Sequence, residues 1–117
     1  MKVLIMNFKQ QKNMKESFDD LINGKLPVLV DFSAEWCGPC KMMKPVLEQL
    51  KDKMTDNIRI LKVDVDRNSA LADKYNIHSV PALMLFQEGK IRWSGVGVVT
   101  SNYLENVINN NCTLLSN

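Results

Sequence analysis

Residues Pro27 to Lys41 read PVLVDFSAEWCGPCK, and this stretch decides the fold. Its first half, Pro27 to Ser33, is almost continuously β-branched and aromatic, which predicts a central strand of a sheet that is covered on both faces. A pair of cysteines follows, and the apolar residues after it repeat at helical spacing. We therefore predict a helix from about Cys37 to Lys53, with a kink at Pro45 and both cysteines in its first turn.

Strand and helix patterns alternate on both sides of this stretch. The other expected strands are Lys2 to Phe8, Ile58 to Asp66, Ala82 to Phe86 and Lys90 to Ser94. The other expected helices are Met14 to Ile22, Asn68 to Tyr75 and a last helix capped by Thr100 or Ser101. Only the hairpin at Gln87-Glu88-Gly89 must be antiparallel. The order β-α-β-α-β-α-β-β-α predicts an α/β fold, a three-layer sandwich with a central mixed β-sheet flanked by helices.

The composition limits the number of domains and the kinds of partner. At 117 residues, 45% hydrophobic and 24% charged, the chain suits a single domain, residues 1–117. Its 15 basic and 13 acidic residues are scattered, so the net charge of +2 offers no basic stripe to a nucleic acid. The sequence has no signal-peptide core and no apolar run of about 20 residues. We expect a soluble cytoplasmic monomer that binds neither nucleic acid nor membrane.

The Cys37/Cys40 pair has three possible roles: a metal clamp, a structural staple or a redox reagent. Three cysteines in all, an odd number, argue against a disulfide framework. A zinc site usually takes four ligands, and only the isolated Cys112 and His78 remain. A disulfide across so short a loop would add little stability, because the chain-entropy gain grows with loop length. The position just after a strand, where ligand chemistry collects in α/β sheets, favours the redox role without a metal.

The two cysteines are expected to differ in their chemistry. Cys37 would lie at a helix N-terminus, where free N–H groups and the helix dipole lower the pKa of a thiol, and Lys41 adds a nearby cation. Cys40, one turn inward, is spaced to attack a mixed disulfide on Cys37, so the expected roles are nucleophile and resolving thiol. Asp31 interrupts an apolar strand and is expected to be buried with a raised pKa, with an edge-facing surface position as the alternative.

Four parts of the sequence together resemble one known family. Val28 to Lys41 (VLVDFSAEWCGPCK), Lys62 to Asp66 (KVDVD), Val80-Pro81 and Val96-Gly97 are similar to the thioredoxin family, in the right order and over nearly the whole chain. The resemblance implies a general protein disulfide reductase with a Cys37-Cys40 redox disulfide and no bound cofactor. It implies disulfide-containing client proteins, and a flavin-dependent thioredoxin reductase that supplies electrons from NADPH. The Gly-Pro pair between the cysteines resembles that of the family's reductants.

The resemblance also implies roles for other residues. Asp31 would be the general acid and base that serves Cys40, and Lys62 would modulate it. A substrate groove with an apolar rim is implied by Trp36, Gly38, Pro39, Val80, Pro81, Val96 and Gly97. Core packing is the alternative role for members of this set. Pro81 resembles the family's cis-proline.

The sequence also supports expectations for four further positions. Ser33 stands where many bacterial members have Trp, and Ala82 where many have Thr, which bears on substrate preference and rate but not on the chemistry. His78 is expected in a solvated loop, with a place at the border of the groove as the alternative. Cys112 is expected to be a partly exposed bystander, with an intermolecular disulfide as the alternative.

Two other functions stand beside the reductase. The fold could act as a binding scaffold with incidental thiols, in which case an activity would survive replacement of both cysteines by serine. It could instead be an oxidase or isomerase, which the reduction potential of the Cys37/Cys40 couple would reveal.

Overall fold

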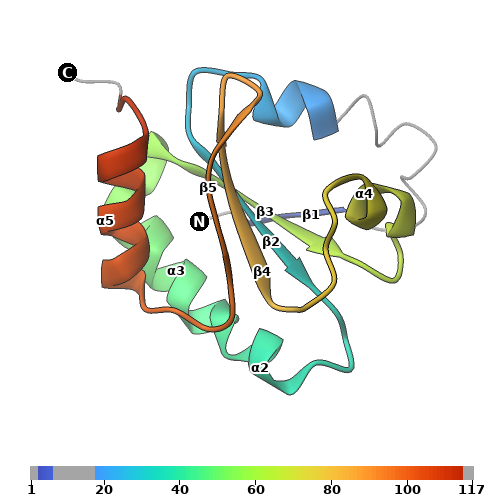
Figure 1. Cartoon of the computed structure of the whole chain (residues 1–117). Coiled ribbons are helices and arrows are strands. Elements are labelled where there is room, and N and C mark those ends of the chain that lie inside the picture. The colour runs from blue at the N-terminus through green and yellow to red at the C-terminus, as the bar shows by residue number, and fades with distance from the viewer. Residues whose placement is uncertain (1–2, 7–17, 115–117) are drawn as a thin grey trace.

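The computed structural model describes residues 3–6 and 18–114, and Figure 1 shows a sheet with helices on either side of it. The strands are β1 (Val3–Met6), β2 (Val28–Ser33), β3 (Arg59–Asp64), β4 (Ala82–Gln87) and β5 (Lys90–Val96). The helices are α2 (Gly38–Lys41), α3 (Met43–Met54), the short 3-10 helix η2 (Thr55–Asn57), α4 (Ser69–Lys74) and α5 (Ser101–Asn111). Residues 18–22 are also helical. The expected strand Lys2 to Phe8 and helix Met14 to Ile22 lie partly outside the described residues.

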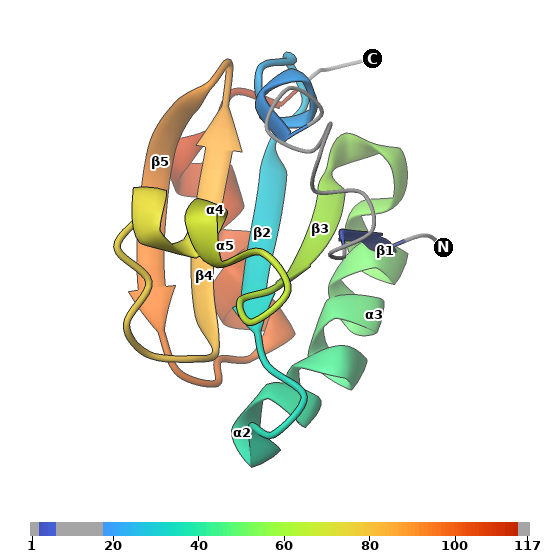
Figure 2. The same ribbon diagram turned by 90° about the vertical axis from the view of Figure 1, so that its right-hand side faces the viewer.

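The strands form one mixed sheet in the order β1-β3-β2-β4-β5. β1, β3 and β2 run parallel, whereas β4 is antiparallel to both β2 and β5. The sequence required an antiparallel pair only in the hairpin, so the β2–β4 pair is a second one. α4 has only six residues and is about 9 Å long, so this helix by itself does not span a strand of about 20 Å. β4 starts near the edge of the sheet where β2 and β3 end (Figure 2).

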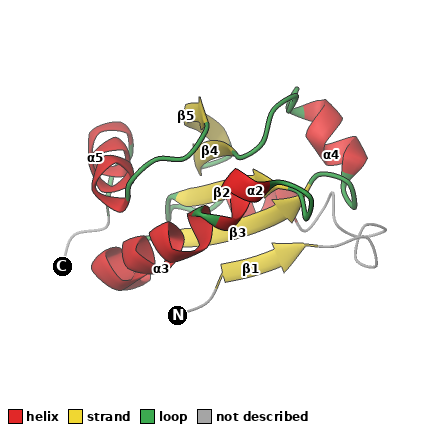
Figure 3. Cartoon of the chain, turned by 90° about the horizontal axis from the view of Figure 1, so that it is seen from below, coloured by secondary structure: helices red, strands yellow, loops and turns green. Residues whose placement is uncertain are grey.

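Each face of the sheet has its own hydrophobic core, and Figure 3 shows the layers from below. All six residues of β2 are buried, which confirms the predicted central strand. Residues packed on the α3 and α5 face include Leu29, Leu47, Leu50, Leu83 and Leu104. Residues packed on the α4 face include Phe18, Ile22, Val30, Phe32 and Phe86. Because side chains alternate along a strand, Asp31 points to the same face as Leu29, toward α3.

The predicted helix from Cys37 to Lys53 is wrong in one respect, because the chain forms two helices. α2 ends at Lys41, and Met42 separates it from α3. Pro45 has no N–H to donate, and its ring clashes with the carbonyl group four residues earlier, which is that of Lys41. The kink expected at Pro45 therefore appears as a break at Met42, and α2 becomes a separate turn that carries the cysteines.

Smaller differences concern the ends of elements. β3 stops at Asp64 and not at Asp66, because the Asp64 carboxylate accepts hydrogen bonds from the backbone N–H groups of Asp66 and Arg67 and turns the chain. β5 runs two residues past the expected end, to Val96. Thr100 caps α5 by accepting a hydrogen bond from the Tyr103 N–H, as expected. No helix within the described ranges has the length and apolar character of a membrane span.

Gly89 closes the β4–β5 hairpin, and its replacement should destabilise the fold. Glu88 and Gly89 have φ angles of 54° and 77°, as a type I′ turn requires. A Cβ atom on Gly89 would lie 2.9 Å from Asn23 Oδ1. We expect Gly89→Ala to lower the free energy of unfolding in urea by about 1 to 2 kcal/mol, because alanine is strained at positive φ. Gly24→Ala, whose Cβ would meet nothing within 4 Å, is the matched control. Equal losses in both variants would contradict this explanation.

Candidate active site

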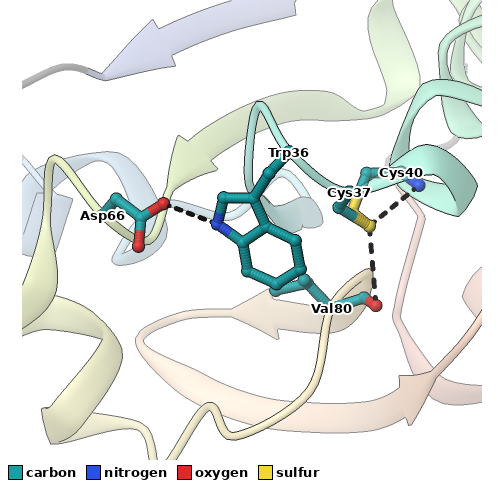
Figure 4. The surroundings of a disulfide bond; sticks show 5 residues. All are labelled: Trp36, Cys37, Cys40, Asp66 and Val80. Atoms are coloured by element: carbon teal, nitrogen blue, oxygen red, sulfur yellow. Dashed lines mark hydrogen bonds between the residues drawn. A yellow bond between two sulfur atoms is a disulfide. The ribbon is translucent and has the colours of Figure 1, made fainter.

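The two cysteines are joined by a disulfide at the start of α2, just past the carboxyl end of β2 (Figure 4). Cys37 is the N-cap residue of α2, and its Sγ accepts a hydrogen bond from the backbone N–H of Cys40 at 3.1 Å. The first N–H groups of a helix have no partner within the helix. The same hydrogen bond, together with the helix dipole, would stabilise a thiolate on Cys37 in the reduced protein.

Both cysteines are buried, although a nucleophile that meets a protein client would be expected at an exposed rim. Cys37 is 4% exposed and Cys40 is 3% exposed. The disulfide packs with Ala34 and against the partly buried Val65 and Val80, and this packing explains the low exposure. Burial therefore does not distinguish the two thiols. Cys37 differs from Cys40 in its N-cap position and in the hydrogen bond that its Sγ accepts.

The Val80-Pro81 turn lies against the disulfide. Its peptide bond is cis, as predicted. The Val80 carbonyl oxygen is 3.7 Å from Cys37 Sγ (Figure 4). The Pro81 carbonyl accepts a hydrogen bond from the Gly97 N–H at 2.8 Å. The segments that precede β4 and follow β5 are thus tied together next to the cysteines.

Trp36 forms an exposed wall beside this turn, with its ring between Asp66 and Val80 in Figure 4. The side chain is 72% exposed, and its Nε1–H donates a hydrogen bond to Asp66 Oδ2 at 2.9 Å. Glu35 and Arg67 form an ion pair at 3.5 Å between the same two loops. Asp66 had no predicted role. Its position could have suggested one. Trp36 follows β2 and Asp66 follows β3, and the carboxyl ends of neighbouring parallel strands lie side by side.

The remaining groove residues surround the same centre. Gly38 and Pro39 are exposed in α2, between the two cysteines. Val96 is 69% exposed at the end of β5, where it is the register partner of Ala82. Gly97 follows with a φ of 98° and open space where a Cβ would lie. The structure thus brings together the rim that the sequence suggested, except that Pro81 itself is buried.

Asp31 is buried in β2, and the edge-facing alternative is wrong. Its side chain is 1% exposed, and its Oδ1 has no hydrogen-bond partner among the described residues. Lys62 is its register partner on β3. Burial raises the pKa of Asp31 to about 6, although the positive charge of Lys62 acts in the opposite direction. An acid with a pKa near neutrality can both accept and release a proton under ordinary conditions.

A pocket of about 510 Å³, the Cys40 pocket, has Cys40 in its lining. Its lining residues are Ser33, Ala34, Glu35, Cys40, Lys41, Lys62 and Asp64. Ser33 is small and buried, so it leaves this space open. Lys62 and Cys40 thus line the same pocket.

The other polar candidates lie outside this arrangement. Among the described residues, no cluster of three or more His, Cys, Asp or Glu side chains could hold a metal ion. Cys112 is a free, half-buried thiol at the end of α5. Burial raises its pKa, and the charge of Arg92 acts against this shift. His78 is exposed in the loop before Val80, as the sequence suggested.

Comparisons with known proteins all point to one family. A sequence model described as Thioredoxin matches residues 9–110. Thioredoxin from Rickettsia bellii is 40% identical over 80% of this chain and 89% of its own length. Thioredoxin from Acidithiobacillus ferridurans is 42% identical, with 76% and 83% covered. Among solved structures, a thioredoxin from Malassezia sympodialis superposes with a TM-score of 0.79 at 31% identity, covering 94% of this chain and 90% of that one.

Proposed function

The chain belongs to the thioredoxin family, and on this premise we propose that it is a protein disulfide reductase and a general electron donor to cytoplasmic protein disulfides. It is a dithiol–disulfide oxidoreductase, and its redox-active centre is the Cys37/Cys40 couple. The single observation that carries the proposal is the hydrogen bond from the Cys40 N–H to Cys37 Sγ at 3.1 Å. It gives one sulfur of the pair a built-in means of stabilising negative charge.

The proposed reaction has two exchange steps. In the first, the Cys37 thiolate attacks one sulfur of a client disulfide, forms a mixed disulfide and displaces the other client sulfur as a thiolate, which takes up a proton. In the second, Cys40 loses its proton and attacks Cys37 Sγ, which releases the second client thiol. The client gains two electrons and two protons, and the protein is left with the Cys37–Cys40 disulfide.

Asp31 is proposed as the base for the second step. A carboxyl group with a pKa of about 6 is mostly ionised at neutral pH and is still basic enough to accept the proton of Cys40. Its Oδ1 lacks a partner among the described residues, so it is free to bond to a water molecule or a thiol. Lys62 is proposed to hold the pKa of this carboxyl within a useful range, because its charge favours the ionised form.

The client is proposed to lie across the apolar rim around the disulfide. The Val80 main chain lies beside Cys37, so an extended client segment could pair with it like an added strand. Trp36 and Val96 are large exposed apolar side chains at this rim, and they would contact the client on either side of its cysteine. Gly38, Pro39 and Gly97 are proposed to shape the rim, because they leave little side chain to obstruct an approaching backbone. Pro81 is buried, and it is proposed to position the Val80 main chain.

A complete catalytic cycle needs a source of electrons. We propose a flavin-dependent thioredoxin reductase, which takes electrons from NADPH and reduces the Cys37–Cys40 disulfide after each turnover. The protein itself would bind no cofactor and act as a monomer of one domain, residues 1–117. An odd number of cysteines in a reducing compartment suits such a role.

Reduction potential should separate the proposed reductase from an oxidase or isomerase. Because the Gly38-Pro39 pair resembles that of reductants, we expect a potential near about −270 mV and not near about −120 mV, a value found in a strongly oxidising relative. Equilibration with a thiol–disulfide buffer would give this value. NADPH consumption with purified thioredoxin reductase and insulin would test the electron path. A strongly oxidising couple without reductase-dependent turnover would contradict the proposal, and a Cys37→Ser/Cys40→Ser protein that kept its activity would support a scaffold instead.

A further inference from the structure

Two pockets lie on either side of residues 77–79, the segment that precedes the Val80-Pro81 turn. The first, the Trp36 pocket, has a volume of about 250 Å³ and is lined by Trp36, Val65 and Val80 as well as this segment. The second, the Met84 pocket, has a volume of about 360 Å³ and includes Met84, Ser94 and Val96 in its lining. Ile77, His78 and Ser79 line both pockets, so they form a ridge between them, the His78 ridge.

The Met84 pocket has buried apolar residues, Ala82 and Leu83, in its lining, together with the exposed polar residues Asn76, His78, Ser79 and Ser94. Met84 is half-buried on β4, and its register partner is the exposed Ser94 on β5. Val96, 69% exposed, adds an apolar wall. None of the described residues that line the pocket is an aspartate, glutamate, lysine or arginine. A charged side chain placed there would lose water without gaining an ionic partner, whereas an apolar one would bury surface.

The Met84 pocket borders the Trp36 pocket across the His78 ridge, and the Trp36 pocket lies beside the redox centre. Val80 follows the ridge directly, lines the Trp36 pocket and has its carbonyl oxygen 3.7 Å from Cys37 Sγ. A client segment that pairs with the Val80 main chain alternates its side chains between two sides. A client segment that continues past Val80 and across the His78 ridge would present one of its side chains to the Met84 pocket. Because the Met84 pocket borders the site where the client is proposed to bind, the client polypeptide is the occupant to which we assign it.

We propose that the Met84 pocket is a client subsite that takes an uncharged apolar side chain near the client's reacting cysteine, and that the His78 ridge and Ser94 set its selectivity. The inference rests on the proposed function, because it assigns a specificity to the same reaction. It predicts a preference between clients whose disulfides are chemically alike. It also predicts that a disulfide too small to reach past the ridge is indifferent to the pocket.

Peptide disulfides that differ at one residue provide the test. Each peptide carries leucine or aspartate at one position within three residues of its cysteine, and its reduction is followed under turnover, with NADPH and purified thioredoxin reductase to re-reduce the protein. At one position we expect the leucine peptide to have a KM about tenfold lower than the aspartate peptide, the scale of one apolar side chain in a pocket. Ser94→Trp, which fills the pocket, should remove this preference by raising the KM of the leucine peptide while kcat stays unchanged.

Two controls separate pocket binding from damage elsewhere. Ile91→Trp changes a half-exposed residue on the same strand that is outside the pocket lining, and it should preserve the preference. Dithiobis-nitrobenzoate, a small aromatic disulfide, should be reduced at the wild-type rate by both variants. Ser94→Asp makes a smaller change at the edge of the pocket and should also weaken binding of the leucine peptide, so the test does not depend on how well the tryptophan variant folds.

Three outcomes would contradict the proposed subsite. An unchanged leucine preference in both Ser94 variants would overturn the subsite while leaving the reductase intact. Equal loss with the peptide and with dithiobis-nitrobenzoate would place the effect at the redox centre and overturn the subsite too. Failure of the wild-type protein to reduce any peptide or insulin would overturn the proposed function, and the subsite with it.

Discussion

Cys37→Ser should abolish the reduction of insulin in the presence of dithiothreitol, down to the rate of dithiothreitol alone. The first exchange step needs a thiolate, and serine at this position cannot supply one. Cys40→Ser should behave differently, because its Cys37 can still attack a client. The mixed disulfide that results has no resolving thiol, so this variant should accumulate covalent complexes with clients. Non-reducing gels and intact-mass measurements would detect these complexes.

The same assignment can be tested without a client. In the reduced wild-type protein, iodoacetamide should modify Cys37 much faster than Cys40 at pH 7. The two thiols are almost equally buried, so a difference in rate would come from the helix N-terminus, where the Cys40 N–H bonds to Cys37 Sγ. Cys112→Ser removes the remaining thiol as a control. Equal modification of Cys37 and Cys40 would count against the assignment of nucleophile and resolving thiol.

Local sequence rules predicted the parts of the fold that depend on local chemistry. The continuous apolar run in β2 requires cover on both faces, and all six of its residues are buried. The Glu88-Gly89 turn similarly specified the hairpin through its left-handed backbone. The break at Met42 was harder, because Pro45 acts on a carbonyl group four residues away and the sequence does not say where the strain is released. The direction of β4 was not predicted, because it depends on the path of the whole connection between β3 and β4, which includes α4 and the loops on either side of it.

Features of the site that depend on residues close in sequence could be predicted. Features that depend on packing between distant segments could not. The Cys37-Cys40 spacing and the burial of Asp31 in an apolar strand could be expected from the sequence. The low exposure of Cys37 could not, because it comes from packing against Ala34 and residues of two later loops. The Met84 pocket is another such case. Its walls come from the loop before β4, from β4 itself and from β5, and only the folded sheet brings them together.

Asp31→Asn should raise stability at neutral pH, by up to about 3 kcal/mol. Burial holds the pKa of Asp31 at about 6 in the folded disulfide form, whereas an unfolded aspartate has a pKa of about 3.9. The folded protein binds this proton more tightly, so the stability it contributes is fully present below about pH 3.9 and is lost as pH rises through about 6. A difference of about two pKa units, at about 1.4 kcal/mol each, gives the expected size. Asparagine carries no charge to bury, so it avoids this loss.

Urea unfolding of the oxidised protein at about pH 7 and about pH 4 would measure the effect. The gain from Asp31→Asn should be large at the higher pH and mostly absent at the lower, where the wild-type carboxyl is protonated in the folded state. Asp52→Asn, at an exposed carboxylate on α3, should change stability little at either pH. A variant that is less stable than the wild type at pH 7 would mean that the carboxylate of Asp31 is favoured, not penalised, by its surroundings.

The same substitution should cost activity, and this links the burial of Asp31 to function. If Asp31 takes the proton of Cys40, Asp31→Asn should slow release of the mixed disulfide by about a hundredfold or more, while attack by Cys37 is little changed. In the wild type, that release should slow as pH falls below about 6, because the base becomes protonated, and the variant should lack this step in its pH profile. Stopped-flow measurement of both phases separates the two exchanges. A variant that gains stability yet resolves its mixed disulfide at the wild-type rate would leave the buried charge without a catalytic role, since its energetic cost would then serve no step of the reaction.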